Sequence, residues 1–238
     1  MNLDFSDDQK FLQSEAKKFL EKEDSIKRSR NVLDKSGSVD AELWQKIIDL
    51  GWTGIRIPEE FDGLGLGHLE LCVIAEELGR FIAPVPFSSS VYLFTETIIR
   101  YGNEDIKKDI LPKLVSGEIV GTLAVTEDFL APTSSNIKTE VSNNKIIGKK
   151  IAVPDAGIAT HSIIVCKSLN GIDLRLIDLS DKSVSISSQD TVDDSRGHFC
   201  IELDNTPSLL VGDENNGWEL YESIINQAAV LFSFEQVG

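Results

Sequence analysis

The sequence is poor in cysteine, in histidine and in positive charge. Its 238 residues include three cysteines and three histidines, and 23 Lys and Arg residues stand against 39 Asp and Glu residues. Cys72, Cys166 and Cys200 are odd in number and widely spaced, which is typical of buried thiols in a reducing compartment. No pair of cysteines has the spacing of metal ligands and the histidines are scattered, so we expect no bound metal.

The shortage of positive charge narrows the range of partners. The formal net charge of −16 argues against a nucleic acid or an anionic membrane surface, because Lys and Arg supply the attraction to phosphate groups. An acidic small ligand such as a nucleotide is not excluded, since local N–H donors can hold it against the overall field.

Leader sequences and long apolar runs are also missing. The N-terminus MNLDFSDDQKF has neither the basic nor the apolar region of a signal peptide. No apolar run approaches the length of a membrane span. These absences predict a cytoplasmic protein with no membrane segment.

The first part of the chain, up to about residue 118, has the apolar spacing of helices. Ser6 and Gln9 predict a capping box at the first helix, and a polar stretch, 22–38, separates it from a second helix that ends near Gly51. Further helices are predicted after residue 67, from 88 to 101 with serines as caps, and after the cap Asn103.

The stretch PEEFDGLGLG, at 58–67, has glycines that suggest a phosphate-binding loop. Its spacing is G-x-G-x-G rather than G-x-G-x-x-G, and nothing before it has the pattern of the first strand of a βαβ unit. We therefore expect a turn between two helices.

Short β-branched runs replace the helical period between about 119 and 213. They are separated by polar or glycine-containing turns, which predicts an antiparallel β-barrel or sandwich. Helical spacing returns from Trp218 to Leu231. The fold class is therefore α+β. The apolar face of this last helix must be buried against another element, so either the helix packs on the N-terminal helices or the natural chain continues.

Four stretches together are more specific than any one of them. IPEEFDGLGLGHLELCVIAEELGR, YGNEDIKKDILPKLVSGE, GTLAVTE and LLVGDENNGWELYES resemble the acyl-CoA dehydrogenase family in order and spacing. APVPF and VPDAGIATHSIIV are similar to the bacterial branch that includes sterol side-chain dehydrogenases. The resemblance implies an N-terminal helical domain (1–118), a middle β-domain (119–213) and the start of a C-terminal helical domain (214–238) whose remainder is absent.

The resemblance also implies a reaction. Enzymes of this family oxidise an acyl-CoA thioester to the 2,3-enoyl-CoA, with a carboxylate as base and FAD as hydride acceptor. It further implies electron-transfer flavoprotein as electron acceptor and a homo- or hetero-oligomer, either a dimer or a tetramer.

Cofactor contacts are implied for GTLAVTE, where Leu123, Val125 and Thr126 face the flavin, and for the backbone of Val153. The triplet Ala152–Val153–Pro154 departs from the family, because it lacks the aromatic ring and the hydroxyl usual there.

For the substrate, the resemblance implies Phe87, Ser89 and Leu93 at the acyl group. Pro132 stands where the family has a CoA-contacting serine, so Ser134 or the adjacent Ser135 is the expected substitute, and Ser134 is the one named here as substrate-binding. Ala228 occupies the position at which a minority of the family carries the catalytic glutamate. We therefore name no catalytic residue.

Two functions remain open from the sequence. The chain is part of an FAD-dependent acyl-CoA dehydrogenase, or it is a non-catalytic partner subunit of a heteromeric enzyme without a flavin site of its own. The two departures at 132 and 152–154 favour the partner subunit. A stand-alone binding module is disfavoured because the last helix would expose its apolar face.

Overall fold

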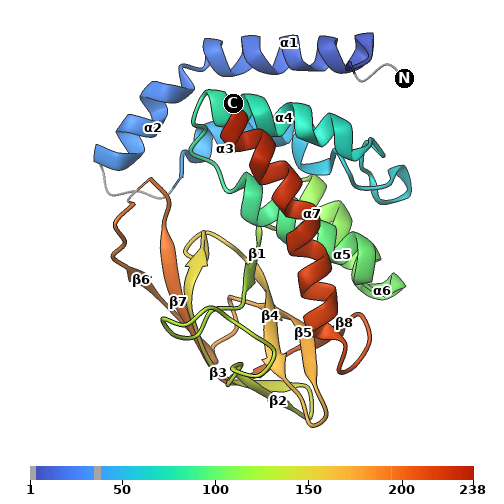
Figure 1. The fold of residues 1–238 in the computed structure, drawn as a ribbon, viewed down its shortest axis with the longest axis vertical. Helices are drawn as coiled ribbons and strands as arrows, with labels where there is room; N and C mark the ends of the chain where they lie inside the picture. Colours follow the sequence, from blue (N-terminus) through green and yellow to red (C-terminus); the bar gives the residue numbers. More distant parts are fainter. Residues whose placement is uncertain (1–3, 35–38, 194) are drawn as a thin grey trace.

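A helical layer lies over one end of a β-sheet, and one long helix runs along both (Figure 1). The computed structural model describes residues 4–34, 39–193 and 195–238. The helices before the sheet are α1 Asp7–Lys22, α2 Ser25–Asp34, α3 Ala41–Asp49, α4 His68–Arg80, α5 Glu96–Tyr101 and α6 Glu104–Val115, with short 3-10 turns η1 Trp52–Gly54 and η2 Glu59–Phe61 and a π-helix η3 Ser88–Thr95.

The predicted helix ends are largely confirmed. The Ser6 hydroxyl accepts from the Gln9 N–H at 3.2 Å while the Gln9 side chain accepts from the Ser6 N–H at 2.9 Å, which completes the capping box. Gly51 takes a left-handed φ of 75° after α3, and the Asn103 side chain accepts from the Ile106 N–H to begin α6. Local side-chain chemistry therefore determines these boundaries.

The polar stretch 22–38 was predicted as a separator, and this is wrong for its described part, because α2 occupies residues 25–34. Val32 is its only buried large apolar side chain. Arg28 instead joins the helix to Glu23, Asp40 and Glu42 through ion pairs. Hydrophobic spacing did not reveal a helix that is attached chiefly by charge.

The stretch 58–67 contains η2 and leads from η1 into α4, so the predicted turn between two helices is confirmed. Of its glycines only Gly65 has a positive φ, 61°, and Asp62 supplies a second left-handed residue. A Cβ at Gly63 would overlap the Ile57 carbonyl. Close approach of the backbone and one left-handed glycine therefore explain the glycine-rich sequence.

The predicted 88–101 helix forms, but in two parts. Residues Ser88–Thr95 are a buried π-helix, and α5 follows it. Ser88 to Ser90 lie inside the π-helix rather than capping it, which corrects that expectation. The Thr95 hydroxyl donates to the Ser90 carbonyl at 2.8 Å. Such π-helical turns are rare and are frequent at functional sites.

The β-domain is one eight-stranded sheet, and most of its pairings are antiparallel. The strands are β1 Gly121–Ala124, β2 Glu140–Ser142, β3 Lys145–Pro154, β4 His161–Lys167, β5 Ile172–Asp178, β6 Val184–Gln189, β7 His198–Pro207 and β8 Leu209–Val211. Their order is β6-β7-β3-β2-β4-β5-β8, and β1 pairs with β4. The α+β class is confirmed. The antiparallel prediction did not include the parallel β1–β4 and β2–β4 pairs.

Alternating side chains on the sheet enter two separate cores. Ile163 and Val165 of β4 pack into the large core shared with the helices, whereas Ile164 and Cys166 pack into a smaller core within the β-domain. Successive residues of a strand point to opposite faces, so one strand contributes to both. The sheet therefore joins the helical layer on one face.

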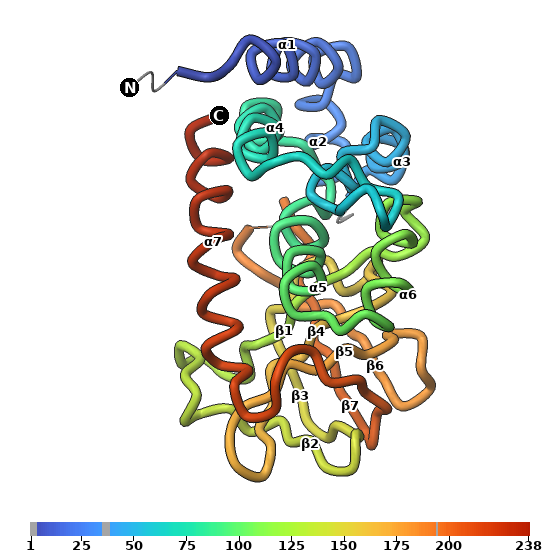
Figure 2. The backbone as a smooth tube through the Cα atoms, turned by 90° about the vertical axis from the view of Figure 1, so that its right-hand side faces the viewer, coloured from blue at the N-terminus to red at the C-terminus, as the bar shows by residue number. Residues whose placement is uncertain are grey.

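The final helix α7, Gly217–Val237, crosses from the sheet to α4 (Figure 2). Its buried residues are Gly217, Ile224, Ala228 and Leu231. A Cβ added at Gly79 of α4 would overlap the Glu235 carbonyl, which shows how closely the two helices approach. The predicted packing of this helix on the N-terminal helices is confirmed.

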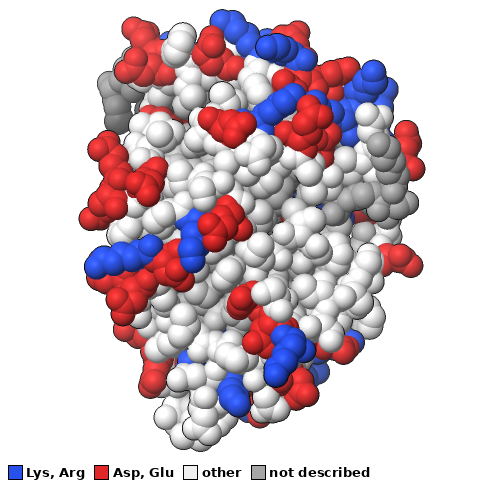
Figure 3. All heavy atoms as spheres, turned by 180° about the vertical axis from the view of Figure 1, so that it is seen from behind, with Lys and Arg blue, Asp and Glu red and all other residues white. Residues whose placement is uncertain are grey.

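The three cysteines are free and buried, as predicted. Burial raises the pKa of the Cys166 thiol to about 12. Among the described residues, no helix is long and apolar enough to cross a membrane. Within the same residues no group of His, Cys, Asp or Glu is arranged to hold a metal ion. Figure 3 shows carboxylates spread over one face of the molecule, with Lys and Arg between them.

Candidate functional site

The structure brings the end of β1 beside the end of β3. The Ile151 N–H donates to the Thr126 carbonyl at 2.8 Å, and the Thr122 hydroxyl donates to the Pro154 carbonyl at 2.7 Å. The two segments predicted to contact flavin, 121–127 and 152–154, are therefore neighbours although about 30 residues separate them.

The four predicted flavin residues differ in accessibility. Leu123 is buried in the large core and Val153 in the β-domain core. Val125 and Thr126 are half-buried, and the Thr126 hydroxyl forms no hydrogen bond with any described residue. Because the side chains of Leu123 and Val153 are buried in the cores, these two residues could contact a ligand only through their backbone atoms.

The β3 strand is distorted where it passes β1. Its pairing with β7 shifts register between Lys150 and Val153, and Ala152 takes a positive φ of 51°. The Ala152 N–H leaves the ladder and donates to the Gln189 side chain at 2.7 Å. Such bulges redirect backbone groups and are frequent beside active sites.

A buried ion pair supports the end of β1. The Lys150 ammonium lies 2.7 Å from the Glu127 carboxylate and 3.1 Å from the Val125 carbonyl, and its side chain is 0% exposed. Glu127 also accepts from the N–H groups of Lys138 and Thr139. Burial lowers the pKa of Lys150, and the adjacent carboxylate opposes that shift. Lys150 thus fixes the position of Val125.

Sequence reasoning missed Lys150, although a signal was present. Ile146 and Lys150 are both buried on β3 and lie four residues apart, so they share one face of the strand. A lysine in phase with the core residue Ile146 indicates a buried partner, because an unpaired ammonium is costly to bury.

The predicted acyl-contacting residues lie in and beside the π-helix. Phe87 packs edge-on between Trp44 and Tyr92, with ring centroids 6.3 and 5.6 Å away. Leu93 is buried in the large core. Ser89 is buried and donates to the Asp155 carboxylate at 2.6 Å. These three residues lie where the helices meet the sheet.

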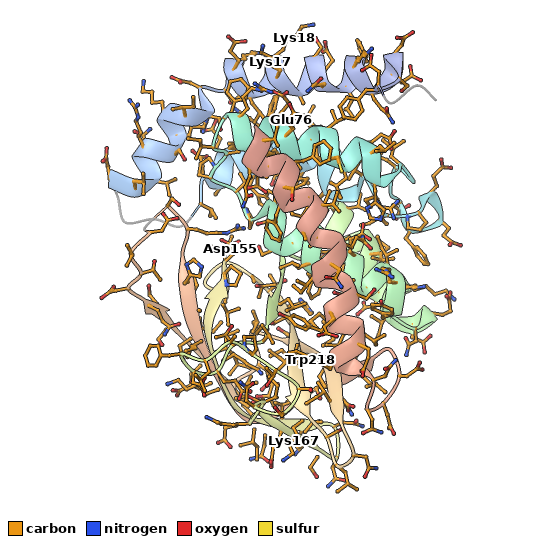
Figure 4. All side chains as sticks on the ribbon, in the orientation of Figure 1. Lys17, Lys18, Glu76, Asp155, Lys167 and Trp218 are labelled. Atoms are coloured by element: carbon orange, nitrogen blue, oxygen red, sulfur yellow. The ribbon has the colours of Figure 1, made fainter. Side chains whose placement is uncertain are left out.

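Asp155, labelled in Figure 4, connects the π-helix to the β-domain. Its Oδ2 also accepts from Nε and Nη2 of Arg196, at 3.1 and 2.7 Å. In the sequence Asp155 lies within the stretch VPDAGIATHSIIV, and no role was predicted for it. Its contacts join segments 66 and 41 residues away, so local pattern did not indicate them.

Ser134 is not brought together with the other substrate residues. It is exposed in a turn in which the Asn136 N–H donates to the Thr133 carbonyl. Phe129 and Leu130 of the same loop are exposed as well. The loop 128–136 therefore presents side chains to solvent, whereas Phe87, Ser89 and Leu93 are buried.

No carboxylate stands at position 228, where Ala228 lies on the buried face of α7. Glu219 and Glu222 on the same helix are exposed, as expected for a solvated face. Glu235 differs, because it is half-buried beside Tyr92, and burial raises the pKa of its carboxyl.

A second missed residue is Glu96, which is 1% exposed. It accepts from Arg56 at 3.0 Å and from Gln227 of α7 at 2.8 Å. Because Arg56 precedes the glycine turn, this one carboxylate links that turn, α5 and α7.

Helices covering one face of a mostly antiparallel sheet, with a closing helix across both, define an α+β protein whose candidate site lies at the layer boundary. Residues 6–118 match the family profile described as acyl-CoA dehydrogenase, N-terminal domain. The chain belongs to the acyl-CoA dehydrogenase family.

Two curated relatives illustrate the similarity. Mitochondrial isovaleryl-CoA dehydrogenase of Pongo abelii is 33% identical over 171 residues, which cover 68% of this chain and 40% of that protein. Acryloyl-CoA reductase (NADH) of Anaerotignum propionicum is 25% identical over an alignment that covers 100% of this chain and 64% of that protein.

Solved structures agree with the fold. A variant of the Tcur3481-Tcur3483 steroid ACAD has a TM-score of 0.82 at 25% identity, covering 96% of this chain and 62% of that one. Acyl-CoA dehydrogenase from Geobacillus kaustophilus has a TM-score of 0.88 at 20% identity, covering 99% and 66%. The chain thus spans less than two thirds of the length of these relatives.

Proposed function

We propose that this chain is the N-terminal and middle part of an FAD-dependent acyl-CoA dehydrogenase that forms the 2,3-enoyl-CoA. The observation that carries the proposal is the half-buried end of β1, where the Thr126 hydroxyl is without a partner among the described residues. The boundaries near 118 and 213 belong to the same proposal.

The residues present fit a flavin ring. A half-buried hydroxyl with no partner among the described residues is available to a ring heteroatom, and the exposed Ala152 at the β3 bulge follows Ile151, which donates to the Thr126 carbonyl. When bound, FAD would supply the two-electron acceptor. Val125 and Thr126 would orient the ring, and the Lys150–Glu127 pair would hold that strand end in place.

For the substrate, Phe87, Ser89 and Leu93 would line the acyl end and Ser134 would meet the CoA portion. The described residues offer no carboxylate at position 228 to remove the α-proton. The proposal therefore assigns binding and orientation, and no proton transfer, to this chain. Electron-transfer flavoprotein, oligomeric assembly and a cytoplasmic location are part of the same proposal.

The second candidate function is a partner subunit without its own flavin. Two observations favour it: Val153 turns its side chain into the β-domain core, and Ala152 and Pro154 offer neither ring nor hydroxyl. Similar folds occur in the ChsE4-ChsE5 complex of Mycobacterium tuberculosis, a pairing of two different chains.

Reconstitution with FAD separates the two candidates. The protein, purified with any partner it co-purifies with, is incubated with FAD and freed of unbound cofactor. The enzyme proposal expects the visible absorption band of bound oxidised flavin, bleached by an acyl-CoA. Absence of that band would contradict the enzyme proposal and favour the partner-subunit role.

Thr126→Val tests the residue that carries the proposal. The change removes a hydroxyl and keeps the shape, so we expect FAD affinity to fall about tenfold, as one lost hydrogen bond predicts. Thr191→Val is the matched control, because among the described residues its hydroxyl donates only to the Asp193 carbonyl in an exposed loop. Equal FAD affinity of the two variants, measured by fluorescence titration, would contradict the assignment.

A further inference from the structure

A network of polar side chains joins the first residue of α4 to α5 and to the middle of α7. Glu96 of α5 is 1% exposed, and it accepts from Nε of Arg56 at 3.0 Å and from Nε2 of Gln227 at 2.8 Å. His68, the first residue of α4, contacts both of these donors. The network thus lies where α7 passes over α4 and α5 in Figure 1.

The contacts of His68 determine which ring nitrogen carries the proton. Its Nε2 lies 3.1 Å from Nη2 of Arg56 and 3.0 Å from Nε2 of Gln227. A guanidinium has only donors, so Nε2 of His68 is an acceptor and the neutral ring carries its proton on Nδ1. The orientation of the Gln227 amide is fixed too, because its Oε1 accepts from Arg100 at 2.7 Å while its Nε2 donates to Glu96.

Protonation of His68 removes the acceptor on which these two contacts depend. The new N–H would point at the N–H groups of Arg56 and Gln227, and a cation is disfavoured at the N-terminal end of a helix such as α4. Glu96 attracts the charge, but its Oε2 lies 3.9 Å away and already accepts from Gln227. Burial lowers the pKa of His68; the charge of Glu96 opposes this shift, and the charges of Arg56 and Arg100 add to it.

We propose that His68 is a pH-dependent switch at the contact between α4 and α7. The neutral imidazole accepts from Gln227 and holds the middle of α7 to the start of α4, whereas the protonated imidazole releases it. The His68 side chain is 41% exposed, so it exchanges protons with solvent and can turn outward while the helices stay folded. Gln227 keeps its bonds to Glu96 and Arg100, so α7 stays attached to α5.

The inference goes beyond the proposed function, because it needs neither FAD nor CoA. Phe232, which follows Gln227 on α7, packs edge-on against Tyr92 of the π-helix, with ring centroids 5.6 Å apart. Phe87 packs edge-on against the same Tyr92. A shift of α7 would therefore act on packed rings that reach a residue expected at the acyl group.

The direction of the pH effect follows from the lowered pKa. Below the ordinary histidine pKa of 6.5 the unfolded chain binds a proton at this residue, whereas the folded protein holds His68 neutral. The stability that neutral His68 contributes is therefore complete above 6.5, and it is lost as the pH falls from there to the folded pKa. Acid should loosen the contact between His68 and Gln227.

Hydrogen–deuterium exchange of the unaltered protein and of His68→Gln tests the switch. Glutamine keeps an acceptor for Arg56 and does not titrate. After correction for the intrinsic pH dependence of exchange, protection of the segment 223–231 should fall about tenfold more in the unaltered protein between about pH 7.5 and about pH 5, the equivalent of one hydrogen bond. An equal loss in both proteins, or no loss in the unaltered protein, would overturn the proposal.

Two further measurements separate the switch from a general effect of acid. His198→Gln removes a histidine outside the network, whose Nδ1 lies 3.1 Å from the Arg196 carbonyl, and it should behave like the unaltered protein. If His68→Gln does not fold, the unaltered protein still decides. A loss of protection at 223–231 that is larger than the loss in β3 supports the switch, and an equal loss in both segments refutes it.

Discussion

At the scale of single residues, the most unusual feature is the buried charge of Lys150. Its ammonium is fully buried in a β-domain and depends on Glu127 for its counter-charge. Replacing a buried pair with apolar groups is often tolerated, whereas removing one partner leaves an uncompensated charge. This asymmetry makes the pair a test of whether the strand end is held as described.

We predict that Lys150→Met lowers the free energy of unfolding by about 3–5 kcal/mol, because Glu127 is left buried without its partner. The double variant Lys150→Met/Glu127→Leu should recover part of that loss. Urea denaturation of Lys150→Met, of Glu127→Leu and of the double variant gives the coupling energy between the two side chains. Strictly additive losses would show that the two side chains do not interact.

Acid should weaken the same pair. Burial pushes the pKa of Glu127 upward, but the hydrogen bond and charge of Lys150 together with the bonds from Thr139 outweigh it, so the folded value lies below the ordinary 4.5. A carboxyl with a lowered folded pKa stabilises fully above its unfolded pKa, and that stability is lost as pH falls through the folded value.

We therefore predict that the unaltered protein loses more stability than Lys150→Met when the pH falls from about 6 to about 3. In the variant the Glu127 pKa is no longer held down by the ammonium. Denaturant midpoints across this range measure the difference. Parallel pH profiles would contradict the predicted shift.

At the scale of elements, Gly79 allows the backbones of α4 and α7 to approach closely. Helix propensity alone predicts that Gly79→Ala stabilises α4 by about 1 kcal/mol. Packing predicts the opposite, because the new Cβ would overlap backbone atoms of Glu235. Overpacking of this kind costs about 1–3 kcal/mol.

We predict net destabilisation for Gly79→Ala, since backbone atoms of α7 yield less readily than a side chain. Ser14→Ala in α1 is the control, because that position is exposed and only propensity changes there. Thermal unfolding of both variants is the measurement. A stabilised Gly79→Ala protein would mean that α4 and α7 are farther apart than described.

At the scale of the whole molecule, we expect the helical layer and the sheet to differ in local stability. Among the described residues, α1 buries only Ala16 and Leu20, whereas β4 contributes four consecutive residues to two cores. Local stability follows the number of buried apolar contacts.

We predict that amides of α1 and α2 exchange with deuterium well before those of β4 and β5. Hydrogen–deuterium exchange with mass spectrometry resolves these segments. Protection of α1 equal to that of β4 would indicate a cover over α1 beyond the contacts described here.

Much of the fold was predictable because it depends on local chemistry. The Ser6–Gln9 capping box, the Asn103 cap, the short apolar run of β4 and the apolar face of α7 are each set by residues close in sequence. The short strands β2 and β8 and the helix α2 were not predicted. Three residues are too few to show a period, and α2 is attached largely through the ion pairs of Arg28.

The candidate site was predicted only in part. The segments 121–127 and 152–154 were named from sequence, and their mutual contact through Thr126 and Ile151 came from the structure. Lys150, Glu96 and Asp155 were missed, because each acts through partners at least 23 residues away.

The sequence by itself determined the class of fold, the turns, the helix caps and the family resemblance, since these depend on neighbouring residues and on order along the chain. Only the tertiary structure decided which side chains of one strand serve which core. It also decided which charges are buried in pairs, and that His68 and Gln227 meet beside Glu96. Those outcomes depend on distances between remote segments, which packing of the whole chain sets.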